Sequence, residues 1–463
     1  MRLFEYVPRA RLWAALAVVI GVAAILAGCG SSSSSTSSAP GASSGGSTSS
    51  SSSTTASSGS SNTSSCGPKP GVKATGSPIN IGTIDTKQPG TDFSDGPNMI
   101  TAYYNCVNAN GGVNGHPVKL FVEYDQTQPA QIAAAAKKLI QSDHVVGIVG
   151  VFDLLECTID QSYWKQLGIY EMGAGIAPEC WSTPNSAAVN MGPRYSSDGA
   201  VQYGLSQKPS KIVFVQSNVP GTGYIAAGPT ALAKAANVPI TALTENVPIN
   251  DANSVALDLV NKAGSGGWVV LNFTPPEALV ILQAAQKLGL EDRVKGWGCS
   301  TPCNTDFLAK ALGPKWNSKL FVNAELTSPD DHNGPEMQLY KNILAQYGKN
   351  VAGGLGSFSE MGYLLGKFSV DAMQTIKNND YSLKNVNAAF KAIKDEKTEL
   401  LCQPWVYGNY SLHIPNNADF TTTPKDGKMV TAQQCFNVSS DDPQIAQYRK
   451  EAGTAPSTNP PTS

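Results

Sequence analysis

Cysteines are the residues of this chain whose chemistry is easiest to read, and there are nine of them. Those that follow position 65 are Cys66, Cys106, Cys157, Cys180, Cys299, Cys303, Cys402 and Cys435. An even number of cysteines indicates disulfides when a chain reaches an oxidising compartment, although eight cysteines permit about a hundred pairings. We predict the pairs Cys66–Cys106, Cys157–Cys180, Cys299–Cys303 and Cys402–Cys435.

The alternative for Cys299 and Cys303 is a metal site. Their spacing suits a zinc-binding loop, but a structural zinc site takes four ligands. Neither a second close cysteine pair nor a histidine pair accompanies them in the sequence. We therefore expect no metal and no cofactor.

Catalytic motifs are missing from the sequence. It lacks the HExxH, GxSxG and Walker patterns of common hydrolases and nucleotide-binding loops. Gly221-Thr-Gly223 imitates the start of a dinucleotide-binding fingerprint, but it begins about five residues after its expected strand, and a lone match is weak. His116, His144, His332 and His413 are scattered in turn-like or polar contexts. We therefore expect that the protein is not an enzyme; a hydrolase would need a nucleophile–base pair that the sequence does not offer.

The N-terminal residues have the pattern of an export signal. Arg2, Arg9 and Arg11 precede and flank an apolar stretch at 12–26, and this is the composition of a signal peptide. The tetrapeptide Leu26-Ala-Gly-Cys29 resembles the lipobox of bacterial lipoproteins, in which the cysteine is diacylated and becomes the new N-terminus. Residues 30–65 are nearly all Ser, Gly, Thr and Ala, so they cannot bury enough apolar surface to fold. We expect a signal peptide at 1–28, lipidation of Cys29, a flexible linker at 29–65, and a protein held at the outer face of the cytoplasmic membrane.

Length and charge narrow the class of the folded part. The chain has 463 residues, which exceeds one average domain. Its formal net charge is −2 and only 15% of its residues are charged. A nucleic-acid-binding domain normally carries a clustered basic face, and the sequence shows no Lys/Arg cluster. We expect a protein that does not bind nucleic acid.

Hydrophobic periodicity predicts strands and helices in alternation. At 129–141, for example, Ile132, Ala135, Ala136 and Leu139 recur at helical spacing. Strands are expected at 79–84, 118–124, 145–150, 169–172, 211–216, 240–245, 268–273, 294–297 and 408–414. Helices are expected at 96–108, 129–141, 158–167, 223–236, 254–263, 276–288, 333–347, 357–377 and 383–394. This alternation predicts an α/β fold with parallel sheets covered on both faces.

One segment matches a known family closely. Asn108-Ala-Asn-Gly-Gly-Val-Asn-Gly115 places glycines where a helix needs a positive-φ cap and a tight turn, and the strand that follows ends in Asp125 before Pro129. In this order, and with the later segments 145–150, 211–223 and 284–290, the chain resembles the type I periplasmic binding proteins of ABC transporters, in the branched-chain amino acid and amide class. The resemblance covers about 78–438.

The resemblance implies two Rossmann-like α/β lobes joined by three crossings, with solute in the cleft between them. The crossings are expected at 190–196, at 321–327 and within 407–423. The domains are expected as follows: lobe 1 at 66–192 and 324–401, lobe 2 at 193–323 and 402–445, the last part closed by a disulfide, and a disordered tail at 446–463.

The same resemblance places the ligand-binding loops after the strands. Carried over loop by loop, the candidate ligand contacts are Phe93, Phe152, Asp153, Leu154, Gly175, Ile176, Ala177, Gly221, Thr222, Phe273, Trp297 and Gly298. Family members hold a ligand carboxylate with Ser/Thr hydroxyls and backbone N–H groups, but the loops 151–156 and 173–177 carry no Ser or Thr. Asp153 either contacts solute or only caps the following helix, which would discourage a carboxylate. No acid lies near Gly298, and Glu325 either replaces it or has a structural role.

These expectations combine into a function. The chain is expected to be a monomeric, lipid-anchored solute-binding protein that delivers a small polar or amino-acid-like solute to the permease subunits of an ABC importer by closing two lobes. The alternative is a lipid-anchored sensor of the same fold that signals to a membrane partner.

Overall fold

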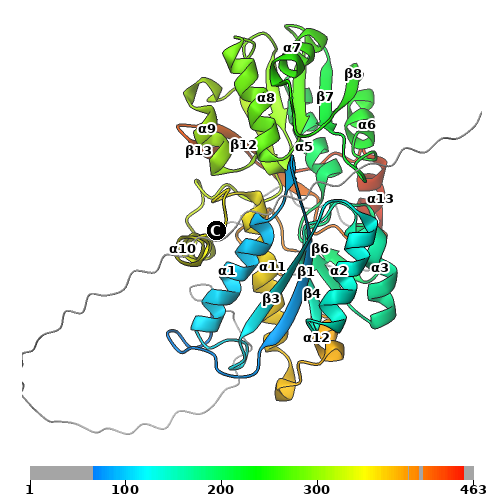
Figure 1. Ribbon diagram of the computed structural model, residues 1–463. Helices are drawn as coiled ribbons and strands as arrows, with labels where there is room; N and C mark the ends of the chain where they lie inside the picture. Colours follow the sequence, from blue (N-terminus) through cyan, green and yellow to red (C-terminus); the bar gives the residue numbers. More distant parts are fainter. Residues whose placement is uncertain (1–65, 395, 406–409, 453–463) are drawn as a thin grey trace, which may run out of the picture. The chain divides into compact units, whose positions relative to one another are not determined.

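The computed structural model describes residues 66–394, 396–405 and 410–452, which belong to one compact unit of the chain (Figure 1). The expected signal peptide, the expected lipidation site Cys29, the expected linker and residues 453–463 of the expected tail lie outside the described residues. Within the described ranges, every helix is too short or too polar to cross a lipid bilayer.

The first sheet is built from the N-terminal part of the described chain. Its strands are β1 (Ile79–Gln88), β2 (Thr91–Asp92), β3 (Val118–Asp125), β4 (Gly147–Val151), β5 (Glu171–Gly173) and β6 (Ser186–Ala188). They are arranged β2-β1-β4-β5-β6, with β3 also paired to β1, and every pairing except the β1–β2 hairpin is parallel. We call this sheet and the helices packed on it lobe 1.

The helices of lobe 1 cover both faces of its sheet. They are α1 (Asp95–Ala109), α2 (Pro129–Gln141), α3 (Glu156–Leu167), α4 (Glu179–Ser182), α10 (Pro335–Tyr347), α11 (Ser357–Gln374) and α12 (Leu383–Lys391), with a short 3-10 turn, η3 (Lys377–Asn379). Alternation along β4 divides the core, because Val149 packs with α1 and α11 while Ile148 packs with α2 and α3. The prediction for 129–141 is confirmed: Pro129 begins α2 and Ile132, Ala135, Ala136 and Leu139 are its buried residues.

The second sheet follows in the chain. Its strands are β7 (Ile212–Ser217), β8 (Ile240–Glu245), β9 (Trp268–Asn272), β10 (Gly296–Cys299), β11 (Leu320–Ala324), β12 (Ala418–Lys425) and β13 (Lys428–Asn437), in the order β13-β12-β11-β10-β9-β7-β8. Strands β7 to β11 are parallel, and β12 and β13 add an antiparallel hairpin beside β11. This sheet and its helices form lobe 2.

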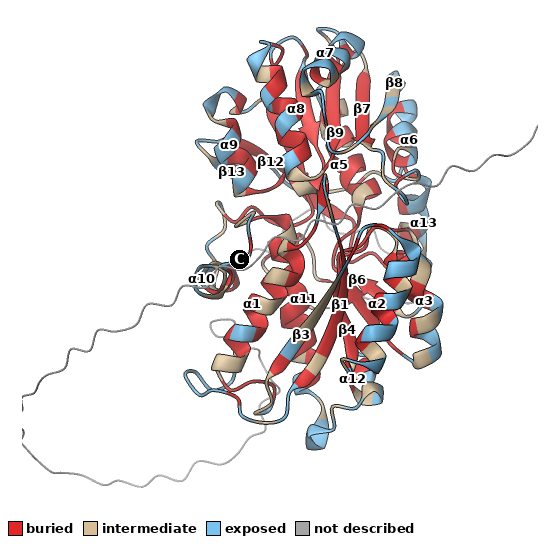
Figure 2. Ribbon diagram, in the orientation of Figure 1, coloured by how far each residue is buried: buried red, intermediate tan, exposed pale blue. Residues whose placement is uncertain are grey.

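Helices also cover both faces of the second sheet. They are α5 (Pro193–Ser206), α6 (Ala227–Ala235), α7 (Ala252–Ala263), α8 (Pro275–Lys287) and α9 (Asp306–Leu312), with 3-10 turns η1 (Thr301–Cys303) and η2 (Pro314–Trp316). Along β7, Val213 and Val215 face α7 and α8, while Ile212 and Phe214 face α5 and α6. Figure 2 shows the central strands buried between exposed helix faces. The predicted α/β class with two parallel-rich sheets is confirmed.

The chain passes between the lobes at three places. It leaves lobe 1 between β6 and α5, returns after β11, and enters lobe 2 again before β12. A backbone bridge between Leu326 and Leu401 joins the second and third passages. The lobe boundaries given above stay predictions.

Two expectations about the C-terminal part are wrong. The described residues of the expected strand 408–414 form no strand; the polar segment at 418–425 forms β12 instead, because β11 and β13 pair with its backbone. The first part of the predicted disordered tail, residues 446–452, belongs to helix α13 (Pro443–Ala452). This helix is stabilised by burial of Ile445 and Tyr448, which its polar sequence did not suggest.

Four disulfides stabilise this fold. They join Cys66 to Cys106, Cys157 to Cys180, Cys299 to Cys303 and Cys402 to Cys435. These are the pairs predicted from the sequence. Because Cys299 and Cys303 are bonded to each other, neither offers the free thiolate that zinc would need.

Candidate functional site

A cavity of about 80 Å³ lies where the loops of the two lobes meet. Its lining follows the carboxyl ends of strands in both sheets, which is where open α/β sheets bind ligands. The lining residues are Thr91, Phe93, Phe152, Leu154, Ala174, Gly175, Ile176, Asn190, Gly192, Pro193, Ser196, Ser217, Val219, Thr222, Ile225, Asn272, Phe273, Thr274, Thr301, Pro302, Glu325, Phe358 and Met361. We call this space the cleft.

Aromatic rings form the lobe 1 wall of the cleft. Phe358, at the start of α11, lies edge-on to Phe93 with 5.3 Å between ring centroids and to Phe152 with 6.4 Å. Phe152 and Phe93 are almost fully buried, and Phe273 of lobe 2 is buried as well. An apolar wall of this kind favours a ligand with an apolar body.

A chain of hydrogen bonds forms the polar side of the cleft. The Ser196 hydroxyl donates to Thr301 Oγ1 over 2.7 Å and accepts from the Thr301 backbone N–H over 2.6 Å. The backbone N–H of Glu325 donates to Thr301 Oγ1 over 3.3 Å. These bonds connect α5, η1 and the end of β11, so they position Glu325 beside the cleft.

Glu325 is the carboxyl group of the cleft lining. Its Oε2 accepts a hydrogen bond from the backbone N–H of Met191, within the first passage between the lobes. Burial raises the pKa of Glu325 to about 7, although hydrogen bonds from Met191, Gly192 and Thr301 oppose that rise. The Glu325 carboxyl group is therefore held beside the cleft by hydrogen bonds that the backbone donates to it.

Asn190 also presents an acceptor. Its Nδ2 donates to the carbonyl oxygen of Gly175 over 2.9 Å. Its Oδ1 is buried and has no hydrogen-bond partner among the described residues. A buried acceptor without a donor is costly, so a hydrogen-bond donor supplied by a ligand would be favourable here.

Asp153 caps α3 and does not line the cleft. Its Oδ1 accepts from the backbone N–H groups of Leu155 at 2.7 Å and Glu156 at 2.8 Å. Of the two roles considered for this residue, the structure shows the cap. The carboxylate thereby occupies the positive end of the helix, where family members could bind an anion.

The structure sorts the predicted ligand contacts into two sets. Those that line the cleft are Phe93, Phe152, Leu154, Gly175, Ile176, Thr222 and Phe273. Asp153, Ala177, Gly221, Trp297 and Gly298 lie outside that lining.

Physical reasons separate the second set from the first. Trp297 points into the helix-covered core, where it packs edge-on against Trp316 and donates to the Glu291 carbonyl over 3.2 Å. Gly298 faces the opposite side of β10, close to Trp268. Strand β10 ends at Cys299, so the cleft contacts come from Thr301 and Pro302 beyond it.

The two other residues lie at the margins of the cleft. Ala177 is buried in a separate apolar cluster that contains Trp181 and Tyr195. Gly221 is exposed, and it lies close to the backbone of Leu154 in the facing lobe. A side chain at this position would clash with that backbone. The φ of Gly221, 82°, also favours glycine.

Several residues that line the cleft were not among the ligand contacts predicted from the sequence. Phe358 and Met361 come from α11, about two hundred residues beyond the other lobe 1 loops in the sequence. Asn272 is the last residue of β9 and Thr301 comes two residues after β10, so a polar residue at the end of a strand was the available signal. Nothing in the sequence distinguishes Phe358 from other apolar residues of its helix.

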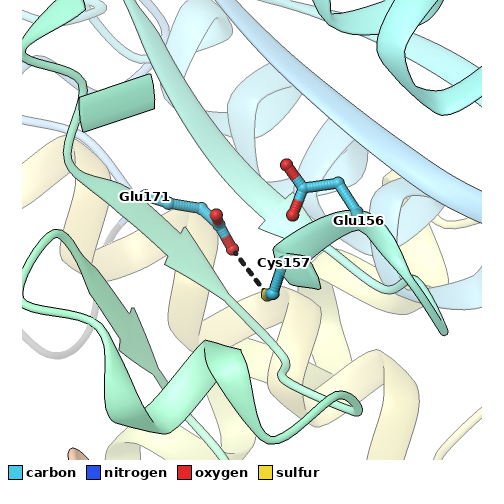
Figure 3. A group of neighbouring side chains, drawn as sticks. All are labelled: Glu156, Cys157 and Glu171. Atoms are coloured by element: carbon cyan, nitrogen blue, oxygen red, sulfur yellow. Dashed lines mark hydrogen bonds between the residues drawn. The ribbon is translucent and has the colours of Figure 1, made fainter. Parts of the chain in front are cut away.

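A second group of side chains lies at the start of α3 and on the neighbouring strand β5 (Figure 3). Glu156, Cys157 and Glu171 bring their terminal atoms within 4.8 Å of one another. Cys157 is bonded to Cys180, so it has no thiolate for a metal, and its sulfur lies 3.5 Å from Glu171 Oε1. Burial raises the pKa of Glu171 to about 8, so protonated carboxyl groups fit this site better than a metal ion does.

These features define a two-lobed α/β binding protein with a ligand cleft. The profile of the family described as periplasmic binding protein matches residues 78–436. The chain belongs to this family, in its type I form, and it is a solute-binding protein of the kind that serves ABC transporters.

Solved structures share the fold at low identity. A fatty acid ABC transporter substrate-binding protein from Thermomonospora curvata has a TM-score of 0.68 at 16% identity, covering 81% of this chain and 97% of its own. A branched-chain amino acid ABC transporter protein from Thermus thermophilus with bound valine has a TM-score of 0.66 at 16% identity, covering 81% and 99%. A solute-binding protein from Rhodopseudomonas palustris HaA2 with p-hydroxybenzoic acid has a TM-score of 0.66 at 14% identity, covering 80% and 100%. A comparison with curated proteins finds no match.

Proposed function

We propose that this protein captures a small solute in the cleft, closes its two lobes around it, and presents the closed form to the permease of an ABC importer. The observation that carries the proposal is the cleft itself, which both lobes line from the carboxyl ends of their strands. A solute that contacts both sides stabilises the closed state over the open one, and a permease can recognise that closure.

Contacts between the lobes support closure. The Thr274 hydroxyl, in lobe 2, donates to the carbonyl oxygen of Gly90 in lobe 1 over 3.3 Å. The Tyr224 hydroxyl, in lobe 2, donates to the carbonyl oxygen of Ile176 in lobe 1. Hydrogen bonds of this kind are individually worth about 1 kcal/mol, so a bound solute can decide whether they persist.

A thermal-shift screen combined with small-angle scattering tests this function. The panel contains amino acids, amides, ureas, short fatty acids and small aromatic acids, which include the ligands named for the similar structures. A true solute raises the melting temperature with concentration and lowers the radius of gyration as the lobes close. Binding without compaction would contradict the closure mechanism, and no binding by any compound would contradict solute capture.

Lipid anchoring through Cys29 completes the proposal. The signal sequence and lipobox support an extracytoplasmic, membrane-held protein, and two or more acyl chains give firm anchoring. Labelling bacteria that express the full chain with a palmitate analogue tests this. We expect label and membrane association in the wild type and neither in Cys29→Ala; label that persists in the variant would contradict lipidation of Cys29.

A further inference from the structure

We infer that the solute is a small, mainly apolar molecule without a negative charge, whose polar end donates hydrogen bonds, as in a primary amide or an alcohol. The inference rests on the proposed function, because it takes the cleft as the solute site. It departs from the ligands named for the similar structures, since valine, p-hydroxybenzoic acid and fatty acids all carry a carboxyl group.

The charge of the cleft lining disfavours an anionic ligand. The lining residues include no Lys, Arg or His within the described ranges, and they include the acid Glu325. Arg194, in the first turn of α5, is held in a two-point ion pair with Asp442 at 2.7 and 2.9 Å and does not line the cleft. A ligand carboxylate would therefore be buried beside a second carboxyl group without a countercharge, which disfavours its binding.

Helix N-termini commonly bind anions through their free backbone N–H groups. At three helix starts near the cleft the first of these groups are engaged or absent. Asp153 already accepts from the first N–H groups of α3. Helix α8 begins with Pro275 and Pro276, which have no N–H to offer. At η1, Thr301 donates its N–H to Ser196 and the next residue, Pro302, has none. At these three helix starts the first N–H groups are therefore either absent or already donated to Asp153 or Ser196.

Several hydroxyl groups of the lining already donate within the protein. The Thr222 hydroxyl donates to the Val219 carbonyl over 2.8 Å, and Ser196 donates to Thr301. The acceptor-bearing residues Asn190 and Glu325, in contrast, line the cleft, and Asn190 Oδ1 is buried without a donor within the described part of the chain. An N–H or O–H group of a ligand would satisfy them.

The size of the cleft limits the apolar body. The volume of about 80 Å³ is smaller than the ~150 Å³ cavity that holds benzene in an engineered protein. A compact branched group fits this arrangement directly, and a benzene ring requires the lobes to open slightly. Matched ligands of both sizes are therefore the proper probes.

Isothermal titration of the full chain at pH 7 with two matched pairs tests the inference. Isobutyramide is compared with isobutyrate, and benzamide with benzoate, because each pair differs only in amide against carboxylate. We expect at least one amide to bind, roughly tenfold or more tighter than its carboxylate partner. Equal or tighter binding of the carboxylates would overturn the inference.

Two variants connect the preference to the cleft. In Glu325→Gln the side chain gains a donor and loses its charge, so amide affinity should fall and carboxylate affinity should rise. Asn190→Ser removes the free acceptor and should weaken amide binding alone. Glu336→Gln is the matched control, since Glu336 is buried on α10 and does not line the cleft. An unchanged amide preference in both Glu325→Gln and Asn190→Ser would overturn the assignment.

The outcomes separate this inference from the proposed function. Carboxylates that bind tightly and compact the protein would leave solute capture standing and remove only the ligand class. If neither the amides nor the rest of the panel binds, solute capture itself is wrong.

Discussion

The Tyr224 hydroxyl, in the loop between β7 and α6, donates a hydrogen bond to the carbonyl oxygen of Ile176, which follows β5 in the other lobe. Ile176 also lines the cleft. The backbone of a cleft-lining residue is thus bonded directly to the opposite lobe. In the proposed mechanism, this pair couples cleft occupancy to lobe closure.

Tyr224→Phe should favour the open state. It removes a hydrogen bond worth about 1 kcal/mol while it keeps the ring, so the Kd for the amide probe should rise about fivefold. Titration measures the Kd, and small-angle scattering should show a larger radius of gyration without ligand. Tyr203→Phe is the control, because Tyr203 stacks on Phe321 and lines no part of the cleft. Equal behaviour of the two variants would show that the Tyr224 contact does not influence closure.

Removing the Cys66–Cys106 disulfide should reduce stability and leave ligand binding unchanged. The bond closes a loop with a sequence separation of 40, for which chain entropy predicts a stabilisation of about 4 kcal/mol. Neither cysteine lines the cleft. The Cys66→Ala/Cys106→Ala variant should unfold at lower denaturant concentration with an unaltered Kd; a changed Kd would contradict this separation of roles.

Removing the Cys299–Cys303 disulfide should affect ligand binding more than stability. Its sequence separation is only 4, so its entropic contribution is smaller, about 2 kcal/mol. It encloses Thr301 and Pro302, which both line the cleft. The Cys299→Ala/Cys303→Ala variant should weaken ligand binding several-fold as that loop relaxes. Retained affinity would show that the hydrogen bonds of Thr301 hold the loop without the disulfide.

Asp153→Ala should destabilise the protein through loss of the α3 cap. Alanine leaves the N–H groups of Leu155 and Glu156 without their acceptor, at a cost of about 1–2 kcal/mol. Asp153→Asn keeps a side-chain oxygen at the same position and should cost less. Chemical denaturation of the two variants measures the difference, and equal losses would point to charge and not to capping.

Two buried carboxyl groups, Asp160 on α3 and Glu171 on β5, should make stability depend on pH. Burial raises the pKa of Glu171 to about 8 and that of Asp160 to about 7. Between pH 5 and 8 the unfolded chain has already released these protons while the folded protein still holds them, so the free energy of unfolding falls as pH rises. The melting temperature should drop by roughly 5 °C over this range.

Glu171→Gln provides the control for that dependence. Glutamine cannot ionise, yet its carbonyl can still accept the hydrogen bond that Gln161 now donates to Glu171 over 2.7 Å. The variant should lose much of the slope between pH 5 and 8. A slope equal to that of the wild type would assign the pH dependence to other groups.

Much of this architecture could be predicted from sequence because it depends on local patterns. Apolar periodicity identified α2 by its own buried face, and continuous apolar runs identified strands such as β7. Loops after those strands then supplied cleft residues such as Phe152 and Phe273. Each of these inferences needs only the periodicity of a helix or strand and the rule that ligands bind at strand ends.

Other features depended on packing that no local pattern encodes. The polar strand β12 exists because β11 and β13 pair with it, and α13 exists because Ile445 and Tyr448 find buried positions. Alternation predicts that Trp297 and Gly298 face opposite sides of β10, but it does not say that both sides are covered by helices. Because helices cover both faces of β10, the cleft is lined by Thr301 and Pro302, which follow the end of this strand.

Local sequence was enough to predict the α/β class, to choose among the disulfide pairings and to reveal the lack of Ser and Thr in the loops 151–156 and 173–177. Only the tertiary structure decided which groups meet in the cleft, including Phe358 from α11 and the acceptors Asn190 and Glu325. The physical reason is that a side chain's class and period are local properties. Whether it is left with a partner, a charge or a cavity depends on segments that folding brings together from distant parts of the chain.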